Sequence, residues 1–384
     1  MSDPLTERGF GIYLHWPFCA SLCPYCDFNS YVAKTVDYAR WEQAIKAELK
    51  RHHAETRGRS LDSIFFGGGT PSLMPPSLVN GILGCIDDLW GISPDTEVTL
   101  EANPGSVDAD NFAGFRSAGV GRISMGVQAL NDPDLAKLGR LHSTSEALAA
   151  LDIATATFDR VSIDLIYARQ DQSLADWEAE LRSALGYGLR HLSLYQLTIE
   201  PGTAFGDRFA RGSLTGLPSE DTAADMFLLT QALCEEAGLP AYEVSNHAES
   251  GQESRHNLIY WKQGDWLGIG PGAHGRLTLD GRRYATDTHR APGAWLKAAE
   301  DGSGEKERHE IDTGDRADEA LIMGLRTRDG LDLAMMETLG WFPPNDVVAD
   351  LCDLGMIEAS NSRLRVTKSG RAVLNPIIAK LAGA

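Results

Sequence analysis

The chain has 384 residues, of which 43% are hydrophobic and 23% charged, a composition typical of a globular protein with two or three domains. Its net charge of −19 disfavours nucleic acid as a partner, because that affinity depends on Lys and Arg contacts to phosphate. The sequence has no apolar run of about 18 residues and no signal-peptide core near its start. These features predict a cytoplasmic protein without an integral membrane segment, in a compartment that keeps thiols reduced.

Short apolar runs alternate with amphipathic stretches over the first two thirds of the chain. The predicted strands are 11–15, 63–66, 98–101, 122–127, 160–166 and 191–197. The predicted helices are 37–53, 77–89, 109–118, 132–137 with 145–154, and 174–186. This alternation predicts an α/β fold with a parallel sheet. Six such units indicate a partial (β/α)6 barrel, in which chemistry gathers at the carboxyl ends of the strands.

The alternation stops after a long loop, one more helix and one more strand, predicted at 197–222, 223–237 and 241–244. We therefore expect a barrel domain at 1–248 and a C-terminal α+β domain at 249–384. The part from about 315 to 384 resembles a winged helix, with expected helices at 317–324, 331–338, 344–354 and 368–381 and a hairpin of 357–359 with 364–366. It carries no basic stripe, which favours packing or partner binding over DNA binding.

Three cysteines form a tight group, Cys19, Cys23 and Cys26, in the pattern Cys-x3-Cys-x2-Cys. A structural zinc site needs four ligands, usually in two close pairs, and the sequence offers no second pair with that spacing. Unrelated core thiols are the other alternative. Three thiolates can instead hold three irons of a [4Fe–4S] cube and leave the fourth iron for a small molecule. The remaining cysteines fall in apolar helical patterns and are expected in the core: Cys85, Cys234 and Cys352.

Glycines and polar residues follow the predicted strands at their carboxyl ends. The run 67–70 (Gly-Gly-Gly-Thr) follows the second strand, Glu101 closes the third, and Gln128 follows the fourth. Arg140 lies in the next loop, and Asp164 lies near the end of the fifth strand. We expect these groups to converge on one mouth that can hold the amine, carboxylate and ribose hydroxyls of a small polar cofactor.

In this order, Cys-x3-Cys-x2-Cys, Gly-Gly-Gly-Thr-Pro, Glu-x-Asn-Pro and Gly-Val-Gln resemble the radical S-adenosylmethionine (SAM) superfamily, in particular its oxygen-independent coproporphyrinogen III oxidase branch. The resemblance implies that the cysteine triplet ligates a [4Fe–4S] cluster whose fourth iron binds SAM. It also implies a set of residues around the cofactors: Tyr13, Tyr25, Gly67, Gly68, Gly69, Thr70, Glu101, Gln128, Arg140 and Asp164. The oxidases bind two SAM molecules, so part of this set corresponds to a second one.

Two departures distinguish this chain from the oxidases of the branch. Phe28 stands where their motif has a fourth cysteine, and 18 residues precede Cys19 where the oxidases carry a longer segment. The chain is more similar to a group of haem chaperones in the same branch, which carry a His-Asn-x-x-Tyr-Trp run like 256–261 here. That resemblance implies haem as a further cofactor and haem-acceptor proteins as partners; a homodimer is left open.

Two histidines are candidates to contact haem. His256 begins the run, and imidazole is a common axial ligand of haem iron. The alternative for His256 is a buried, hydrogen-bonded residue packed among core aromatics. His274 lies in the glycine loop 268–275, which we expect to return to the barrel mouth; the alternative is a loop cap.

Overall fold

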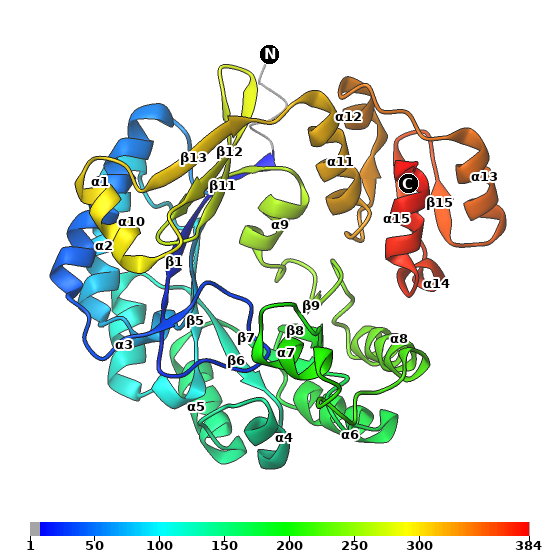
Figure 1. The fold of residues 1–384 in the computed structure, drawn as a ribbon, viewed down its shortest axis with the longest axis horizontal. Helices are drawn as coiled ribbons and strands as arrows, with labels where there is room; N and C mark the ends of the chain where they lie inside the picture. Colours follow the sequence, from blue (N-terminus) through cyan, green and yellow to red (C-terminus); the bar gives the residue numbers. More distant parts are fainter. Residues whose placement is uncertain (1–7, 384) are drawn as a thin grey trace.

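The computed structural model describes residues 8–383 and contains one large sheet of 11 strands (Figure 1). Hydrogen-bonded neighbours follow the order β13-β12-β11-β10-β1-β4-β5-β6-β7-β8-β9. Parallel pairing runs through its middle, along β10 (Asp265–Ile269), β1 (Phe10–Trp16), β4 (Ser63–Gly68), β5 (Glu97–Ala102), β6 (Arg122–Gln128), β7 (Arg160–Tyr167) and β8 (His191–Gln196). Antiparallel strands flank this region: β9 (Asn246–Ala248), β11 (His274–Leu279), β12 (Arg282–Thr288) and β13 (Glu305–Glu310).

Helices cover the outside of the curved sheet, as Figure 1 shows for α1, α2, α3 and α5. The strands are therefore buried on both faces, which explains why they read as nearly continuous apolar runs rather than alternating ones. The helices that follow the strands are α1 (Tyr38–Glu55), α2 (Pro76–Trp90), α3 (Ala109–Ala118), α4 (Asp132–Lys137), α5 (Thr144–Thr157), α6 (Leu174–Leu185) and α8 (Glu220–Glu236), with short 3-10 helices η2 (Pro71–Leu73) and η3 (Pro104–Ser106). The predicted partial (β/α) barrel is confirmed.

The expected boundary near residue 248 falls inside this sheet. β10 pairs in parallel with β1, and β11–β13 continue the sheet from β10. Helix α10 (Pro292–Glu300) packs on α1, with the rings of Trp41 and Trp295 stacked at 5.4 Å. Leu267 and Trp295 also belong to the barrel core. We therefore propose that the first structural unit extends to about residue 310.

The C-terminal module has a separate hydrophobic core, built from residues 317–381. Its elements are α11 (Thr313–Gly324), β14 (Leu331–Asp332), α12 (Leu333–Thr338), α13 (Asn345–Asp353), β15 (Ile357–Ala359), β16 (Arg363–Val366), α14 (Lys368–Arg371) and α15 (Leu374–Ala382). The predicted hairpin gains a third strand, because 331–332 pair with β16 instead of starting a helix. The single helix expected at 368–381 is two helices, because Pro376 fits the first turn of α15 but not a helix interior.

Two further expectations in the barrel were wrong. The loop 197–222 contains helix α7 (Ala204–Ala210), which begins where the Thr203 hydroxyl accepts from the Gly206 amide at 3.0 Å. The strand expected at 241–244 is a turn, and the strand forms at 246–248. The buried Glu243 carboxylate fixes that turn by accepting from the Asn246 side chain and the Ser245 amide. Among residues 8–383, no helix is long and apolar enough to cross a membrane.

Candidate functional site

The cysteine loop follows β1 at the carboxyl end of the parallel strands and is fastened to its surroundings by backbone contacts. Strands β2 (Phe18–Cys19) and β3 (Tyr31–Val32) pair with each other across it. The amide of Phe205 on α7 donates to the Pro24 carbonyl at 2.8 Å. At Gly139 (φ +68°) a Cβ atom would lie 2.7 Å from the Pro24 ring, so the loop after α4 packs directly on the cysteine loop. The loop is thus closed by its own β2–β3 pairing and held by α7 and by the loop after α4.

Polar groups lie near the three half-buried thiols. Arg140 Nη1 donates to Cys23 Sγ at 3.6 Å. Burial raises the pKa of Cys26 to about 11, and the nearby Phe28 backbone acts in the opposite direction. All three cysteines are free, and within residues 8–383 no set of three His, Cys, Asp or Glu side chains is arranged around a single ion. A four-iron cube differs from such a site in taking each thiolate at a different iron.

The glycine run at the end of β4 is packed against the cysteine loop. A Cβ at Gly69 would lie 2.8 Å from the Phe18 carbonyl oxygen and 3.0 Å from Cys19 Sγ. At Gly68 (φ +108°), a Cβ would lie 2.6 Å from the His15 ring. Thr70 follows, and its amide donates to the Phe18 carbonyl at 2.9 Å. The glycines are therefore needed for close backbone approach, whatever ligand they also contact.

Gly67 takes part in the same packing deeper in the barrel. A Cβ there would lie 2.8 Å from the Tyr13 ring and 2.9 Å from the Phe65 ring. The Tyr13 hydroxyl bonds to His15 Nδ1 at 3.0 Å, and His15 Nε2 bonds to the Asn29 carbonyl at 2.9 Å. Burial raises the pKa of Tyr13 well above its usual value, with the nearby Glu101 charge acting in the same direction. Tyr13 thus lies inside the barrel on β1, the strand that leads to the cysteine loop.

Gln128 and Arg140 converge on Gly126 at the end of β6. Gln128 has φ +73°, beside a register shift in the β6–β7 pairing, a bulge of the kind found next to functional sites. Arg140 Nη2 donates to the Gly126 carbonyl at 2.6 Å, while its other terminal nitrogen reaches Cys23. A Cβ at Gly126 would lie 2.7 Å from the Gln128 amide nitrogen. Two of the predicted SAM-contacting residues therefore lie together beside the cysteine loop.

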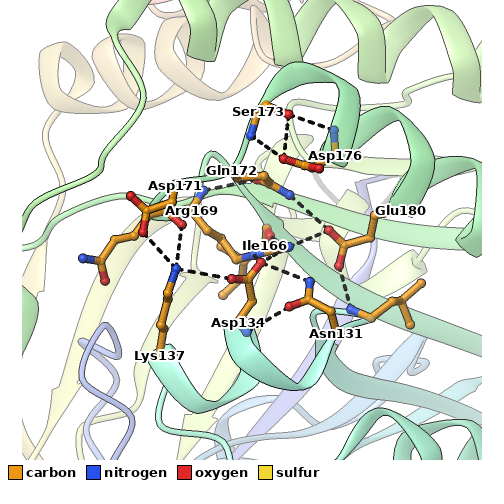
Figure 2. Close-up of polar contacts among 12 residues, drawn as sticks. Asn131, Asp134, Lys137, Ile166, Arg169, Asp171, Gln172, Ser173, Asp176 and Glu180 are labelled. Atoms are coloured by element: carbon orange, nitrogen blue, oxygen red, sulfur yellow. Dashed lines mark hydrogen bonds and ion pairs between the residues drawn. The ribbon is translucent and has the colours of Figure 1, made fainter.

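A buried ion network fixes the segment that carries Arg140. Figure 2 shows Arg169 between Asp134 on α4 and Glu180 on α6, with N···O distances of 2.8 and 2.6 Å. The Glu180 carboxylate also accepts from the Leu130 amide at 2.6 Å, directly after the β6 bulge. The network was not predicted from the sequence. An Arg just after the fifth strand of the pattern was its one signal.

Two predicted carboxyl groups lie half-buried near each other within the barrel. Burial, reinforced by the neighbouring Asp164 charge, raises the pKa of Glu101 to about 8. Burial also raises the pKa of Asp164 to about 6, and Asp164 accepts from the Ser124 hydroxyl at 3.1 Å. The Gly68 amide donates to Glu101 at 3.2 Å. Because desolvation penalises the two negative charges, this site favours a cation bound beside them.

Arg122 was missed among the site residues. It begins β6, is buried, and its positive charge lowers the pKa values of both Glu101 and Asp164. A charged residue at the start of an otherwise apolar strand is a sequence signal for such a role. Its guanidinium also lies 3.4 Å from the imidazole of His191.

His256 lies on the far side of the barrel interior from the cysteine loop, on α9 (Arg255–Trp261). Its Nδ1 bonds to the Ser63 hydroxyl at 2.8 Å and its Nε2 to the Tyr260 hydroxyl at 2.7 Å. Its ring stacks on Phe65 at 4.6 Å, and burial lowers its pKa to about 3. Both ring nitrogens are therefore engaged, and this geometry favours a buried, hydrogen-bonded histidine over an iron ligand.

The glycine loop 268–275 returns to the cysteine loop, as expected. The Asn29 side chain donates to the carbonyls of Pro271 and Arg290 at 2.9 and 2.8 Å. His274 is exposed at the start of β11 and pairs with Asp287. The structure thus places His274 near the mouth but directs its imidazole toward a carboxylate of the next strand.

Comparisons with known proteins agree with this arrangement. Residues 13–184 match the model of the Radical SAM superfamily, and residues 311–373 match that of the HemN C-terminal domain. The chain is 36% identical to Radical S-adenosyl methionine domain-containing protein 1, mitochondrial, of Bos taurus, over 98% of this chain and 88% of that protein. It is 36% identical to Heme chaperone HemW of Mycobacterium tuberculosis, over 99% of this chain and 96% of that protein. The Escherichia coli Heme chaperone HemW is 40% identical over 74% and 75%.

Among solved structures, the coproporphyrinogen III oxidase HemN of Escherichia coli superposes with a TM-score of 0.81. The alignment covers 97% of this chain and 90% of that one, at 20% sequence identity. The similarity therefore shows a shared fold that includes the C-terminal module.

Proposed function

The chain belongs to the HemW family of radical SAM proteins, and we propose that it is a haem chaperone, which binds haem and passes it to acceptor proteins. The observation that carries this proposal is the similarity to a HemW protein over almost the full length of both chains. Phe28 supports it, because the oxidase motif has a cysteine at this position and this chain does not. We also infer a compartment that keeps thiols reduced, such as the cytoplasm.

The residues at the barrel mouth fit the family's cofactors. When bound, a [4Fe–4S] cluster supplies an electron and a coordination position, at the iron without a thiolate, for SAM. Cys19, Cys23 and Cys26 would hold the cluster. Arg140 already donates to Cys23 Sγ, which offsets the negative charge of a thiolate there.

The half-buried carboxyl groups would meet the positively charged part of SAM. A cation placed beside Glu101 and Asp164 lowers their pKa values, so both carboxyls would ionise as the ligand binds. Gln128 and the run 67–70 lie between these carboxyls and the cysteine loop and would orient the remaining polar groups.

The alternative is an oxidase that decarboxylates the propionates of coproporphyrinogen III. Anaerobically reconstituted protein is incubated with coproporphyrinogen III, SAM and a reductant, and in parallel titrated with ferric haem and offered a haem-free acceptor protein. We expect haem uptake, seen as a shifted Soret band, and transfer to the acceptor, without protoporphyrinogen. Formation of protoporphyrinogen, or failure to take up haem, would overturn the proposal.

A further inference from the structure

A cavity of about 720 Å³ lies between the barrel and the C-terminal module. Arg8, Trp261 and Lys262 line it from the barrel side, and α11, β14 and α12 line it from the other. Arg8 precedes β1, whereas the cysteine loop follows β1, so the length of this strand, about 20 Å, separates the cavity from the cysteines. None of the residues assigned above to the cluster or to SAM lines this cavity.

The lining of the cavity is positively charged, in contrast to the chain as a whole. Its charged residues are four cations and two carboxylates: Arg8, Lys262, Arg316, Arg363, Asp329 and Asp332. The carboxylates already have partners, since Lys262 lies 3.5 Å from Asp329 and Arg363 lies 3.4 Å from Asp332. In a protein of net charge −19, such a local excess of cations indicates an anionic ligand.

Arg8 and Arg316 are the two lining cations that form no ion pair with residues 8–383. Burial lowers the pKa of Arg8, and the like charge of Arg316 lowers it further, so the two guanidinium groups lie close enough to repel each other. The Asp332 charge acts on Arg8 more strongly than Arg316 does and in the opposite direction, but Asp332 also pairs with Arg363 and caps α12 by accepting from the Met335 amide at 3.1 Å. Within residues 8–383, no carboxylate lies within ion-pair distance of Arg316. A ligand with two carboxylates would neutralise this pair.

The remaining walls are apolar and suit a flat macrocycle. Trp261 lies at the end of α9, and Leu331, Met335 and Leu339 face it from β14 and α12. An indole packs well against an aromatic face. The Met335 thioether is a known type of axial ligand for haem iron. The volume lies within the range of small-molecule sites, roughly 300–1,000 Å³.

We propose that this cavity is the haem site, with the macrocycle between Trp261 and Met335 and its two propionates at Arg8 and Arg316. The inference rests on the proposed haem-chaperone function and specifies where haem binds. It assigns the role of the His-Asn-x-x-Tyr-Trp run to its last residue, because His256 and Tyr260 face the barrel interior while Trp261 faces the cavity. It also places haem at the opposite end of the barrel from SAM.

The test compares two probes on the full-length protein: ferric haem, and ferric haem whose two carboxylates are esterified. We expect Arg8→Gln and Arg316→Gln each to weaken haem binding about tenfold or more, since each removes a hydrogen-bonded ion pair to the ligand. The wild type should bind the ester more weakly than haem, and the Arg variants should not weaken ester binding further. Arg116→Gln, an exposed arginine paired with Asp159 on the barrel, is the matched control.

A second variant fills the cavity without touching a charge. Ala334 lines the cavity on α12 and is exposed, so Ala334→Trp should block haem without disturbing the core. Ala379→Trp, also exposed on the same module but outside the cavity, is its control. If the wild type binds haem and the three test variants, Arg8→Gln, Arg316→Gln and Ala334→Trp, bind it as well as their controls do, the cavity is not the haem site. If the wild type itself binds no haem, the proposed function fails first.

Discussion

The buried ion network in Figure 2 allows a quantitative prediction for Arg169→Met. The Arg169 side chain is 3% exposed, and its partners Glu180 and Asp134 are 7% and 15% exposed. Removing one partner of a buried pair leaves the other charge uncompensated, which costs about 3–5 kcal/mol. Glu180 keeps the Leu130 amide and Asp134 keeps Asn131, so we expect a loss near the lower end of that range.

The assay is urea unfolding of the apoprotein, followed by tryptophan fluorescence and far-UV circular dichroism. Arg182→Met is the matched control. Arg182 pairs with Glu178 on the exposed face of α6, the helix that also carries Glu180, and the two side chains are 55% and 42% exposed. An exposed pair of this kind contributes about 0.3–0.5 kcal/mol. Adding Glu180→Gln to Arg169→Met should recover part of the loss, because it removes the orphaned charge.

Because Arg169 holds α4, its loss should also move Arg140 away from Cys23 and lower iron incorporation on reconstitution. A free energy of unfolding that drops by less than about 1 kcal/mol, as in the Arg182 control, would refute the reasoning. The same holds if the double variant is no more stable than Arg169→Met, since the buried charge would then not be the source of the cost.

Three further predictions concern the site. The folded-state pKa of Glu101 is about 8, above the unfolded value of about 4.3, so the apoprotein should lose stability as pH rises from about 5 to 8. Glu101→Gln should reduce the change of the urea unfolding midpoint over this pH range. An unchanged pH dependence in this variant would contradict the prediction. Gly69→Ala should reduce the yield of reconstituted cluster, because the added methyl group displaces Cys19. Gly84→Ala is the control: Gly84 lies on α2 with open space around it, so this variant should leave cluster yield unchanged and raise the free energy of unfolding by about 0.4–1 kcal/mol. His256→Phe should lower the free energy of unfolding by about 1–3 kcal/mol, because it leaves the hydroxyls of Ser63 and Tyr260 without their partner. Haem affinity should stay within a factor of two. A large loss of haem affinity in a stably folded variant would identify His256 as an iron ligand.

The order of strands and helices in the barrel could be predicted from the sequence because each strand is buried on both faces and each helix has one apolar side. Helix ends were predictable where capping residues mark them, as at Ser143 and Ser173. The pairing of β10 with β1 was not, because residues 265–269 and 10–16 are far apart in the chain and no helix of the repeating pattern joins them. For that reason we propose a boundary near residue 310 in place of the one expected near residue 248.

The residues of the candidate site likewise include some that could be predicted from the sequence and some that could not. Cys19, Gly69, Gln128 and Arg140 could be recognised because short motifs name them, and the structure brings them together. Arg122 could not, since its role depends on two carboxyls that reach it from other strands. The cavity between the barrel and the C-terminal module could not be predicted from the sequence either, because its walls come from four separate segments of the chain.

Helix α9 lies between the barrel interior and the cavity proposed for haem. Its inward side chains, His256 and Tyr260, are fixed by Ser63 and by an aromatic stack that includes Tyr13, so they close the barrel interior beneath the half-buried carboxyls. Its last residue, Trp261, belongs to the cavity on the other side. If haem binds there, the helix and its ring stack separate it from the cluster, and direct contact between haem and SAM is excluded. Strand β1 also joins the two sites, since it runs from Arg8 at the cavity to the cysteine loop, so β1 and α9 are the elements through which the cluster would affect haem transfer.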